Sequence, residues 1–307
     1  MKNFINIGDV DKKDLRTIID HAKSQKEKRS SLKKSAIDPN TPLENKTLVM
    51  IFEKPSTRTR LSFEIAMKQL GGKLLTLNPK ESHYGSGDES IHDTAKVLSQ
   101  YGDLVMMRTS DHDHFLEFSK HLDVPIINGL TNLSHPCQIM SDIMTFEELK
   151  GPITNKKIAW LGDGNNIVYS LIEASVQFNF ELAIACPKQL TPNKKVLKWA
   201  KGKKAKISIT NDPNKAASLA DCVMTDKWIS MGDKVNKIKK KKLLKSYQVN
   251  NKIMKLAKAD AIFMHCLPAN RGEEVTNEVM DGKQSVVWLE ALNRVHVQKS
   301  IIEWCLK

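Results

Sequence analysis

Short apolar runs alternate along the chain with longer stretches in which apolar residues recur every three or four positions. The runs are typical of buried strands, and the periodic stretches are typical of amphipathic helices. We expect strands at residues 47–52, 73–77, 104–108, 124–128, 157–161, 181–186, 206–209, 222–225, 262–265 and 286–289. We expect helices at residues 11–29, 61–70, 90–101, 113–121, 135–149, 167–178, 192–200 and 293–306. This alternation predicts parallel sheets with helices packed on them.

The helix expected at residues 135–149 divides this pattern into two sets of strands. Pro136 stands at its first helical position, and Gly151-Pro152 ends it. A chain of 307 residues is long enough for two domains. We therefore expect two open parallel-sheet α/β domains joined by helices, with residues 1–134 in the first and residues 135–292 in the second.

Composition excludes several classes of protein. With 40% hydrophobic residues, the chain can bury a large core. Its five cysteines contain no CxxC pair and no metal-ligand spacing, so we expect neither a disulfide scaffold nor a zinc site, and a reducing cytoplasm fits best. The N-terminus lacks the apolar core of a signal peptide, and no apolar run is long enough to span a bilayer. We expect a cytoplasmic protein without a membrane role.

The formal net charge of +13 raises the question of an anionic partner. The densest basic run, Lys239 to Lys242, contains no aromatic residue on which a base could stack. Runs of like charge are usually exposed, so we interpret this one as a solvated face and expect no nucleic acid partner. A protein that binds nucleic acid through its charge stays an alternative, and its affinity would fall steeply with salt.

The segment from Phe52 to Glu64, FEKPSTRTRLSFE, carries the sharpest chemical pattern in the chain. It places hydroxyl groups and guanidinium groups where a strand ends and a helix begins. Amide hydrogens at a helix N-terminus favour an anion, and arginine binds phosphate oxygens in a bidentate way. The segment therefore predicts a phosphate site. A helix cap with surface arginines is the alternative for these residues alone.

This segment resembles the carbamoyl phosphate motif of the aspartate and ornithine carbamoyltransferases. His135-Pro136-Cys137-Gln138 is similar to the second motif that the family shares, and it follows at the expected place. Asp226 to Gly232 and His265 to Pro268 are similar to the substrate and catalytic loops of the ornithine branch. The resemblance covers almost the whole chain. It implies an N-terminal carbamoyl phosphate-binding domain completed by a C-terminal helix at residues 293–307, an ornithine-binding second domain, and a homotrimer.

The matched positions imply a set of carbamoyl phosphate ligands: Ser56, Thr57, Arg58, Thr59, His83, Arg108, His135, Gln138 and Arg294. Arg108 and His135 would be catalytic, because attack on the carbamoyl carbon builds negative charge on an oxygen that fixed donors stabilise. His83 would reach into a neighbouring subunit, although its loop, residues 83–90, has one residue more than is usual. Without the resemblance, Arg108 could be a surface arginine at a strand end and His135 a helix cap.

The matched positions also imply the ornithine ligands: Asn166, Asp226, Ser230, Met231, Cys266 and Leu267. Asn166 would bind the α-carboxylate, and Asp226 would fix the α-amino end by charge complementarity. Cys266 and Asp226 would be the catalytic residues of this half, with Cys266 contacting the reacting amine and helping to deprotonate it. A lone cysteine read without the resemblance is more often inert core.

Carbamoyl phosphate is already an activated donor, so we expect neither a cofactor nor a metal. The segment Asp111-His112-Asp113-His114 could suggest a metal site, but adjacent loop residues rarely converge on one ion, and we interpret it as a solvated helix start. Gly162-Asp163-Gly164 begins like a dinucleotide-binding motif but lacks the later glycine.

The resemblance implies transfer of the carbamoyl group from carbamoyl phosphate to the δ-amine of L-ornithine, which gives L-citrulline and phosphate in arginine metabolism. A sibling transferase acting on another amine, such as putrescine or N-acetylornithine, is the nearest alternative. The sequence leaves open whether the reaction serves arginine synthesis or citrulline breakdown, since both directions use the same site chemistry.

Overall fold

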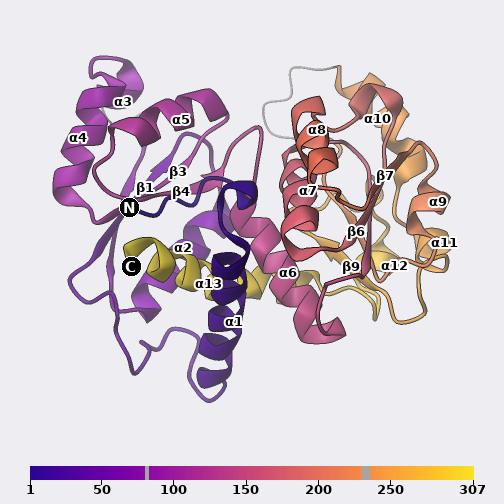
Figure 1. Ribbon diagram of the computed structural model, residues 1–307, viewed down its shortest axis with the longest axis horizontal. Coiled ribbons are helices and arrows are strands. Elements are labelled where there is room, and N and C mark those ends of the chain that lie inside the picture. The colour runs from indigo at the N-terminus through magenta and orange to yellow at the C-terminus, as the bar shows by residue number, and fades with distance from the viewer. Residues whose placement is uncertain (80–82, 230–235) are drawn as a thin grey trace. The chain divides into compact units, whose positions relative to one another are not determined.

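The computed structural model describes residues 1–79, 83–229 and 236–307 (Figure 1). They form two compact units, one made of Met1–Met140 with Leu292–Lys307 and the other of Ser141–Ala291. Both divisions fall inside helices, α6 (Pro136–Lys150) and α13 (Val287–Leu306). The expected fold class is confirmed, including the return of the C-terminal helix to the first unit. The boundary that we expected after residue 134 lies just before α6.

The first unit contains a four-stranded sheet in the order β2-β1-β3-β4, with all pairs parallel. Its strands are β1 (Thr47–Phe52), β2 (Lys73–Leu77), β3 (Leu104–Arg108) and β4 (Ile126–Leu130). Its other helices are η1 (Ile7–Asp9), α1 (Lys12–Lys28), α2 (Thr57–Gln69), α3 (His83–Ser86), α4 (Ile91–Tyr101) and α5 (His112–His121). Phe115 and Phe118 of α5 are fully buried in a core cluster with Val49 and Val105 of the two central strands. The strands β1, β3 and β4 are largely buried, as apolar runs predict, whereas the edge strand β2 is mostly exposed.

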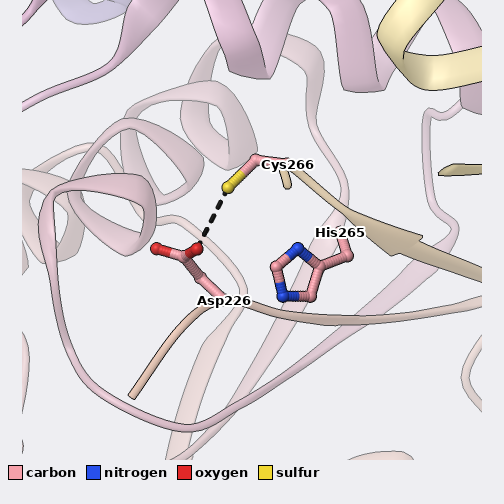
Figure 2. A group of neighbouring side chains, drawn as sticks. All are labelled: Asp226, His265 and Cys266. Atoms are coloured by element: carbon pink, nitrogen blue, oxygen red, sulfur yellow. Dashed lines mark hydrogen bonds between the residues drawn. The ribbon is translucent and has the colours of Figure 1, made fainter. Parts of the chain in front are cut away.

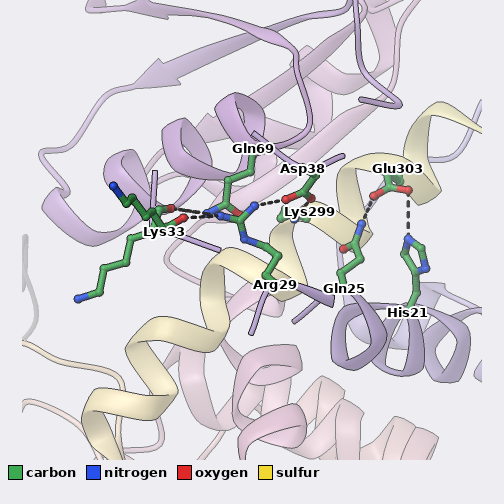
Figure 3. Close-up of polar contacts among 9 residues, drawn as sticks. His21, Gln25, Arg29, Lys33, Asp38, Gln69, Lys299 and Glu303 are labelled. Atoms are coloured by element: carbon green, nitrogen blue, oxygen red, sulfur yellow. Dashed lines mark hydrogen bonds and ion pairs between the residues drawn. The ribbon is translucent and has the colours of Figure 1, made fainter. Parts of the chain in front are cut away.

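A cluster of buried charges fixes α13 within the first unit (Figure 3). The side chain of Lys299 is fully buried and pairs with Asp38, and the same carboxylate accepts a hydrogen bond from the Arg29 guanidinium. Glu303, one turn further along α13, accepts hydrogen bonds from Gln25 and from His21, the latter at 3.1 Å. These contacts join the C-terminal helix to α1 and to the loop that follows it.

The second unit contains a five-stranded parallel sheet in the order β7-β6-β5-β8-β9. Its strands are β5 (Lys157–Leu161), β6 (Glu181–Ala185), β7 (Ile207–Thr210), β8 (Cys222–Thr225) and β9 (Ile262–His265). Its helices are α7 (Asn166–Phe178), η3 (Lys188–Leu190), α8 (Lys194–Gly202), α9 (Pro213–Ala217), α10 (Lys237–Leu244), η4 (Lys245–Tyr247), α11 (Asn251–Met254) and α12 (Asn277–Met280). None of the helices that the structure describes is long and apolar enough to cross a membrane.

Parallel pairing decides where the functional side chains can lie. Because neighbouring strands run the same way, the residues that follow them come to one edge of each sheet. In the first unit, Phe52 at the end of β1 stands opposite Arg108 at the end of β3. In the second, Thr225 at the end of β8 stands opposite His265 at the end of β9. Both expected substrate loops therefore begin at the carboxyl edge of a sheet.

Two expectations were wrong in the second half of the chain. The strand expected at residues 286–289 is the start of α13, where Val287 and Glu290 are buried at helical spacing and Trp288 is 64% exposed. A four-residue apolar run does not distinguish the two structures. The basic run is not wholly solvated either, because Lys240 is buried and pairs with Asp163 at 2.6 Å.

Candidate active site

The phosphate loop, Ser56 to Thr59, lies between β1 and α2. Ser56 is the N-cap of α2, and its hydroxyl accepts a hydrogen bond from the backbone N–H of Thr59 at 3.3 Å. This cap starts the helix before Leu61, the first residue that we expected in it, because a serine N-cap satisfies an amide that the first turn leaves open. The helix cap thus uses residues of the predicted phosphate site.

Arginines from two distant parts of the chain meet at Thr59. Arg108 at the end of β3 donates to the Thr59 hydroxyl at 3.3 Å, and Arg294 of α13 donates to the same oxygen at 2.9 Å. Arg294 also donates to the side-chain oxygen of Gln138 on α6, at 2.6 Å. A hydroxyl oxygen has two acceptor positions, so these two bonds leave its hydrogen to be donated elsewhere. The arrangement orients two cations and one hydroxyl donor within a single buried cluster.

His135 directly precedes α6 and is buried. Burial lowers its pKa well below the usual value, and the positive charges of Arg294, Arg108 and Arg58 lower it further. The imidazole is therefore neutral at physiological pH, and it can donate one hydrogen bond without adding a charge. Such a donor suits the oxygen of an acyl group that becomes negative during attack.

The structure brings together five of the residues expected to bind carbamoyl phosphate: Thr59, Arg108, His135, Gln138 and Arg294. Arg58 lies near enough for its charge to act on His135, whereas Thr57 is exposed on the first turn of α2. His83 is exposed on α3, and its expected role at a neighbouring subunit stays a prediction.

Asp226 and Cys266 face each other in the second unit, after the ends of β8 and β9. Figure 2 shows the Cys266 sulfur pointing toward the Asp226 carboxylate, to which it donates a hydrogen bond at 3.1 Å. The other carboxylate oxygen accepts a hydrogen bond from the side-chain amide of Asn165, at 2.8 Å. Asn165 is the N-cap of α7, so the helix that carries Asn166 also fixes the orientation of Asp226.

The Cys266 thiol is protonated in this setting. Burial raises its pKa well above the usual range, and the charges of Asp226 and Glu290 raise it further. The thiol therefore acts as a hydrogen-bond donor to Asp226 in this structure. Its expected part in deprotonating the substrate amine stays a prediction.

His265 lies beside this pair and supports the loop that contains Cys266. Its Nδ1 accepts the backbone N–H of Leu267 at 2.9 Å, so its hydrogen is on Nε2, 3.3 Å from a Glu274 oxygen. Its backbone N–H donates to Glu290 at 2.9 Å. Asp226, His265 and Cys266 offer ligand atoms within 4.8 Å of one another, but a metal ion would displace one of these histidine hydrogen bonds.

Leu267 has an unusual backbone conformation, and Gly164 lies close to the backbone of another segment. Leu267 has a positive φ of 56° and precedes Pro268 through a cis peptide bond. A Cβ on Gly164 would lie 2.5 Å from the carbonyl oxygen of Leu190, so only glycine fits there. Asn166 is the first residue of α7, where backbone N–H groups favour an anion, and its expected role as the carboxylate ligand stays a prediction. Ser230 and Met231 lie outside the described residues.

Sequence reasoning missed several supporting residues, above all Asn165, Glu290 and Glu53. Asn165 is the first residue of an Asn-Asn pair before a predicted helix. This pattern indicates an N-cap, but it does not indicate the hydrogen bond from Asn165 to Asp226. Glu290 is buried and lies far from His265 in the sequence, so no local pattern points to it. Glu53 stands in the phosphate motif, where its hydroxyl partners come from other segments.

Two family models match the chain. Residues 2–148 match the carbamoyl-P binding domain of aspartate/ornithine carbamoyltransferase, and residues 154–305 match its Asp/Orn binding domain. The chain belongs to the aspartate/ornithine carbamoyltransferase family. These two ranges follow the two units of the structure, apart from the C-terminal helix.

Relatives within the family match over their full length. The ornithine carbamoyltransferase of Rhodopseudomonas palustris is 51% identical, with 99% of this chain and 97% of that protein covered. That of Agrobacterium fabrum is 50% identical, with 99% and 98% covered. The solved ornithine carbamoyltransferase from Pyrococcus furiosus superposes with a TM-score of 0.92 at 43% identity, covering 98% of this chain and 96% of that one. The anabolic enzyme from Campylobacter jejuni gives 0.91 at 36% identity, with 99% of each chain covered.

Proposed function

We propose that the protein transfers the carbamoyl group of carbamoyl phosphate to the δ-amine of L-ornithine, giving L-citrulline and phosphate. The observation that carries the amine half of this proposal is the Asp226 carboxylate, which Asn165 and Cys266 hold at the carboxyl edge of the second sheet. A carboxylate fixed in this way suits a substrate that carries ammonium groups. Relatives with about half of their residues identical are all named for this activity.

Carbamoyl phosphate binding is assigned to the first unit. Ser56, Thr57, Arg58 and Thr59 bind the phosphate, with Arg294 added from α13 and His83 added from α3 of a neighbouring subunit. Arg108 contacts both the phosphate and the carbonyl oxygen, while His135 and Gln138 bind the carbamoyl oxygen and amide. This assignment is supported by the buried hydrogen bonds that orient Arg108 and Arg294 on Thr59. Donors fixed before the reaction cost no reorganisation when charge develops.

The reaction needs no covalent intermediate. The neutral δ-amine attacks the carbamoyl carbon, a C–N bond forms, and the carbonyl oxygen becomes negative beside Arg108 and the neutral His135. The bond to the phosphate oxygen then breaks, and phosphate leaves with the electron pair and accepts the proton that the amine nitrogen loses. Holding both substrates in position supplies much of the rate enhancement.

Ornithine binding is assigned to the second unit. Asn166 binds the α-carboxylate, and Asp226, with Ser230 and Met231, binds the α-amino end. Cys266 and Leu267 contact the δ-amine, with the thiol as a neutral partner that positions the nitrogen. An alkyl ammonium has a pKa of about 10.4, so activity is expected to rise from neutral toward alkaline pH as the free amine increases. An activity that is flat between pH 7 and 9 would contradict direct attack by the amine.

We also infer a homotrimer in the cytoplasm. Apolar side chains that remain exposed on adjacent elements of the first unit support an assembly: Leu61, Ile65 and Leu75 are 51%, 38% and 52% exposed. The five cysteines are all free, which suits a reducing compartment. Sedimentation equilibrium of the purified protein tests the assembly, and a particle of one chain would contradict it.

The function is tested by incubating the purified protein with carbamoyl phosphate and each of four amines: L-ornithine, aspartate, putrescine and N-acetylornithine. We expect citrulline from ornithine alone, and we expect Arg58→Ala to abolish its formation. Turnover of another amine would keep the assignment of the first unit and overturn that of the second. No turnover with any amine would refute the proposal, and binding to nucleic acid that weakens with salt would then favour the alternative.

A further inference from the structure

Three segments that carry predicted carbamoyl phosphate ligands meet at one carboxylate, that of Glu53. This residue directly follows β1 and lies three positions before Ser56, the first residue of the phosphate loop. Its backbone N–H donates to the carbonyl of Arg108 at 3.0 Å, and its Oε2 accepts a hydrogen bond from Thr109, the next residue. Its Oε1 accepts the hydroxyl of Tyr84 at 3.1 Å, and Tyr84 follows His83 on α3. The Glu53 carboxylate thus links the phosphate loop, the end of β3 and α3.

Tyr84 is held on its other side by α5. Its hydroxyl oxygen contacts Nε2 of His114, and that nitrogen lies 3.3 Å from the same Glu53 oxygen. The rings of Tyr84 and His114 stack at 5.8 Å between centroids, and Phe118 meets the tyrosine ring edge-on at 5.7 Å. Since the tyrosine has one hydrogen and donates it to Glu53, it accepts from His114. The direction of each hydrogen bond is therefore fixed.

The hydrogen bonds of the Tyr84 hydroxyl help to hold the side chain in place, in addition to the packing of its ring. A cavity of about 100 Å³, lined in part by Ile51, Leu77 and Leu98, adjoins the ring, so shape alone does not fix it. Burial raises the pKa of Tyr84, and the charge of Glu53 raises it further, so the hydroxyl keeps its hydrogen and donates it. His114 had been interpreted as part of a solvated helix start, but it is about three quarters buried in this contact.

We propose that Tyr84 is a positioning residue for carbamoyl phosphate. Its hydroxyl, held between Glu53 and His114, fixes α3 relative to the phosphate loop and to Arg108, and so sets where His83 is presented. The inference rests on the proposed function, because it concerns the binding of that reaction's donor. Tyr84 acts through other residues and does not itself contact the substrate.

The test is Tyr84→Phe, which removes the hydroxyl and keeps the ring that packs on His114 and Phe118. We expect the KM for carbamoyl phosphate to rise about tenfold, as the loss of about 1.4 kcal/mol from binding would give, with the KM for ornithine changed less than about twofold. Tyr101→Phe is the matched control, since Tyr101 is 71% exposed on α4 of the same unit. It should leave both KM values and the melting temperature unchanged.

A second variant separates positioning from general support of the fold. Glu53→Gln should also raise the KM for carbamoyl phosphate. The double variant should raise this KM by less than the product of the two single fold-changes, because both substitutions affect the same hydrogen bond between Tyr84 and Glu53. An unchanged KM for carbamoyl phosphate in Tyr84→Phe would overturn the inference. A parallel loss of kcat, both affinities and thermal stability would also overturn it, since that result describes a structural residue.

Failure of the proposed function is recognised separately. If the unaltered protein forms no citrulline, the binding of inorganic phosphate to the wild type and to Tyr84→Phe is compared by calorimetry. Weaker phosphate binding in the variant supports the positioning role without the reaction, and equal binding refutes it.

Discussion

Two buried clusters of cations lie along α13, and they differ in the groups that receive their hydrogen bonds. Arg294 donates to the Thr59 hydroxyl and to the Gln138 amide oxygen, both of which are neutral. Lys299, further along the same helix, pairs with the Asp38 carboxylate, which also binds Arg29. The hydroxyl and amide oxygens orient the Arg294 guanidinium, whereas the Asp38 carboxylate also compensates the charges of Lys299 and Arg29. We therefore predict that the first cluster serves an anionic ligand and the second serves the fold.

Loss of the charge at Arg294 should give the largest effect. In Arg294→Gln we expect kcat/KM to fall by about 10²- to 10³-fold, because a fixed donor to the reacting group is removed. The melting temperature should change little, because the new side-chain amide can donate a hydrogen bond to the Thr59 hydroxyl or to the Gln138 side-chain oxygen. Arg271→Gln is the matched control, as that arginine is partly exposed and pairs with Asp281. If the activity of Arg294→Gln falls only because less of the variant is folded, then Arg294 stabilises the fold as Lys299 does, and the predicted difference between the two clusters is wrong.

Removing the carboxylate of the second cluster should do the reverse. Asp38→Asn leaves Lys299 and Arg29 buried beside a neutral group, and breaking such a pair costs about 3–5 kcal/mol of unfolding free energy. Urea unfolding measures this loss, and kcat/KM per folded molecule should stay within about twofold. The rim variant His21→Asn, which loses a half-exposed contact with Glu303, should cost under about 1 kcal/mol. If Asp38→Asn and His21→Asn lower the free energy of unfolding by the same amount, Asp38 is not the residue that stabilises the cluster.

A further expected effect is a pH dependence of stability at His296, which is confined to acid pH. Burial lowers its pKa to about 3, and the charges of Lys299, Lys26 and Arg29 contribute. An unfolded histidine titrates near pH 6.5, so between about pH 6.5 and 3 the unfolded chain binds the extra proton and stability falls as pH falls. His296→Gln should reduce this slope by up to about 1.4 kcal/mol per pH unit. Urea unfolding of both proteins at several pH values checks it, and identical slopes would exclude His296 as a contributor.

The sequence predicts most of the fold because most strands are short, buried apolar runs, whereas the edge strands β2 and β7 are partly exposed. The bounds of β1, β2, β3, β5, β8 and β9 agree with the expected ranges. Short helices such as α9 and α11 escaped prediction, since four or five residues do not establish a period. The burial of Lys240 was not predicted either, because its ion-pair partner Asp163 lies in a different segment.

The candidate site is predicted unevenly for a related reason. Residues that stand in one segment, such as Ser56 to Thr59, show their chemistry in sequence order. Contacts between segments leave no local pattern, so the hydrogen bonds of Arg294 to Thr59 and of Asn165 to Asp226 appear only in the fold. Resemblance to a family supplied the residue Arg294, but not the atoms that orient it.

The first unit consists of two parts of the chain that are synthesised at different times, and this affects the order of folding. Domains generally fold as they emerge, N-terminal first. Here the first unit takes Met1–Met140 and then Leu292–Lys307, so the ribosome must make the whole of Ser141–Ala291 before that unit can close. Until then Thr59 and Gln138 lack Arg294, and Asp38 lacks Lys299. A nascent chain therefore has no complete phosphate site, and its second unit can finish folding before its first.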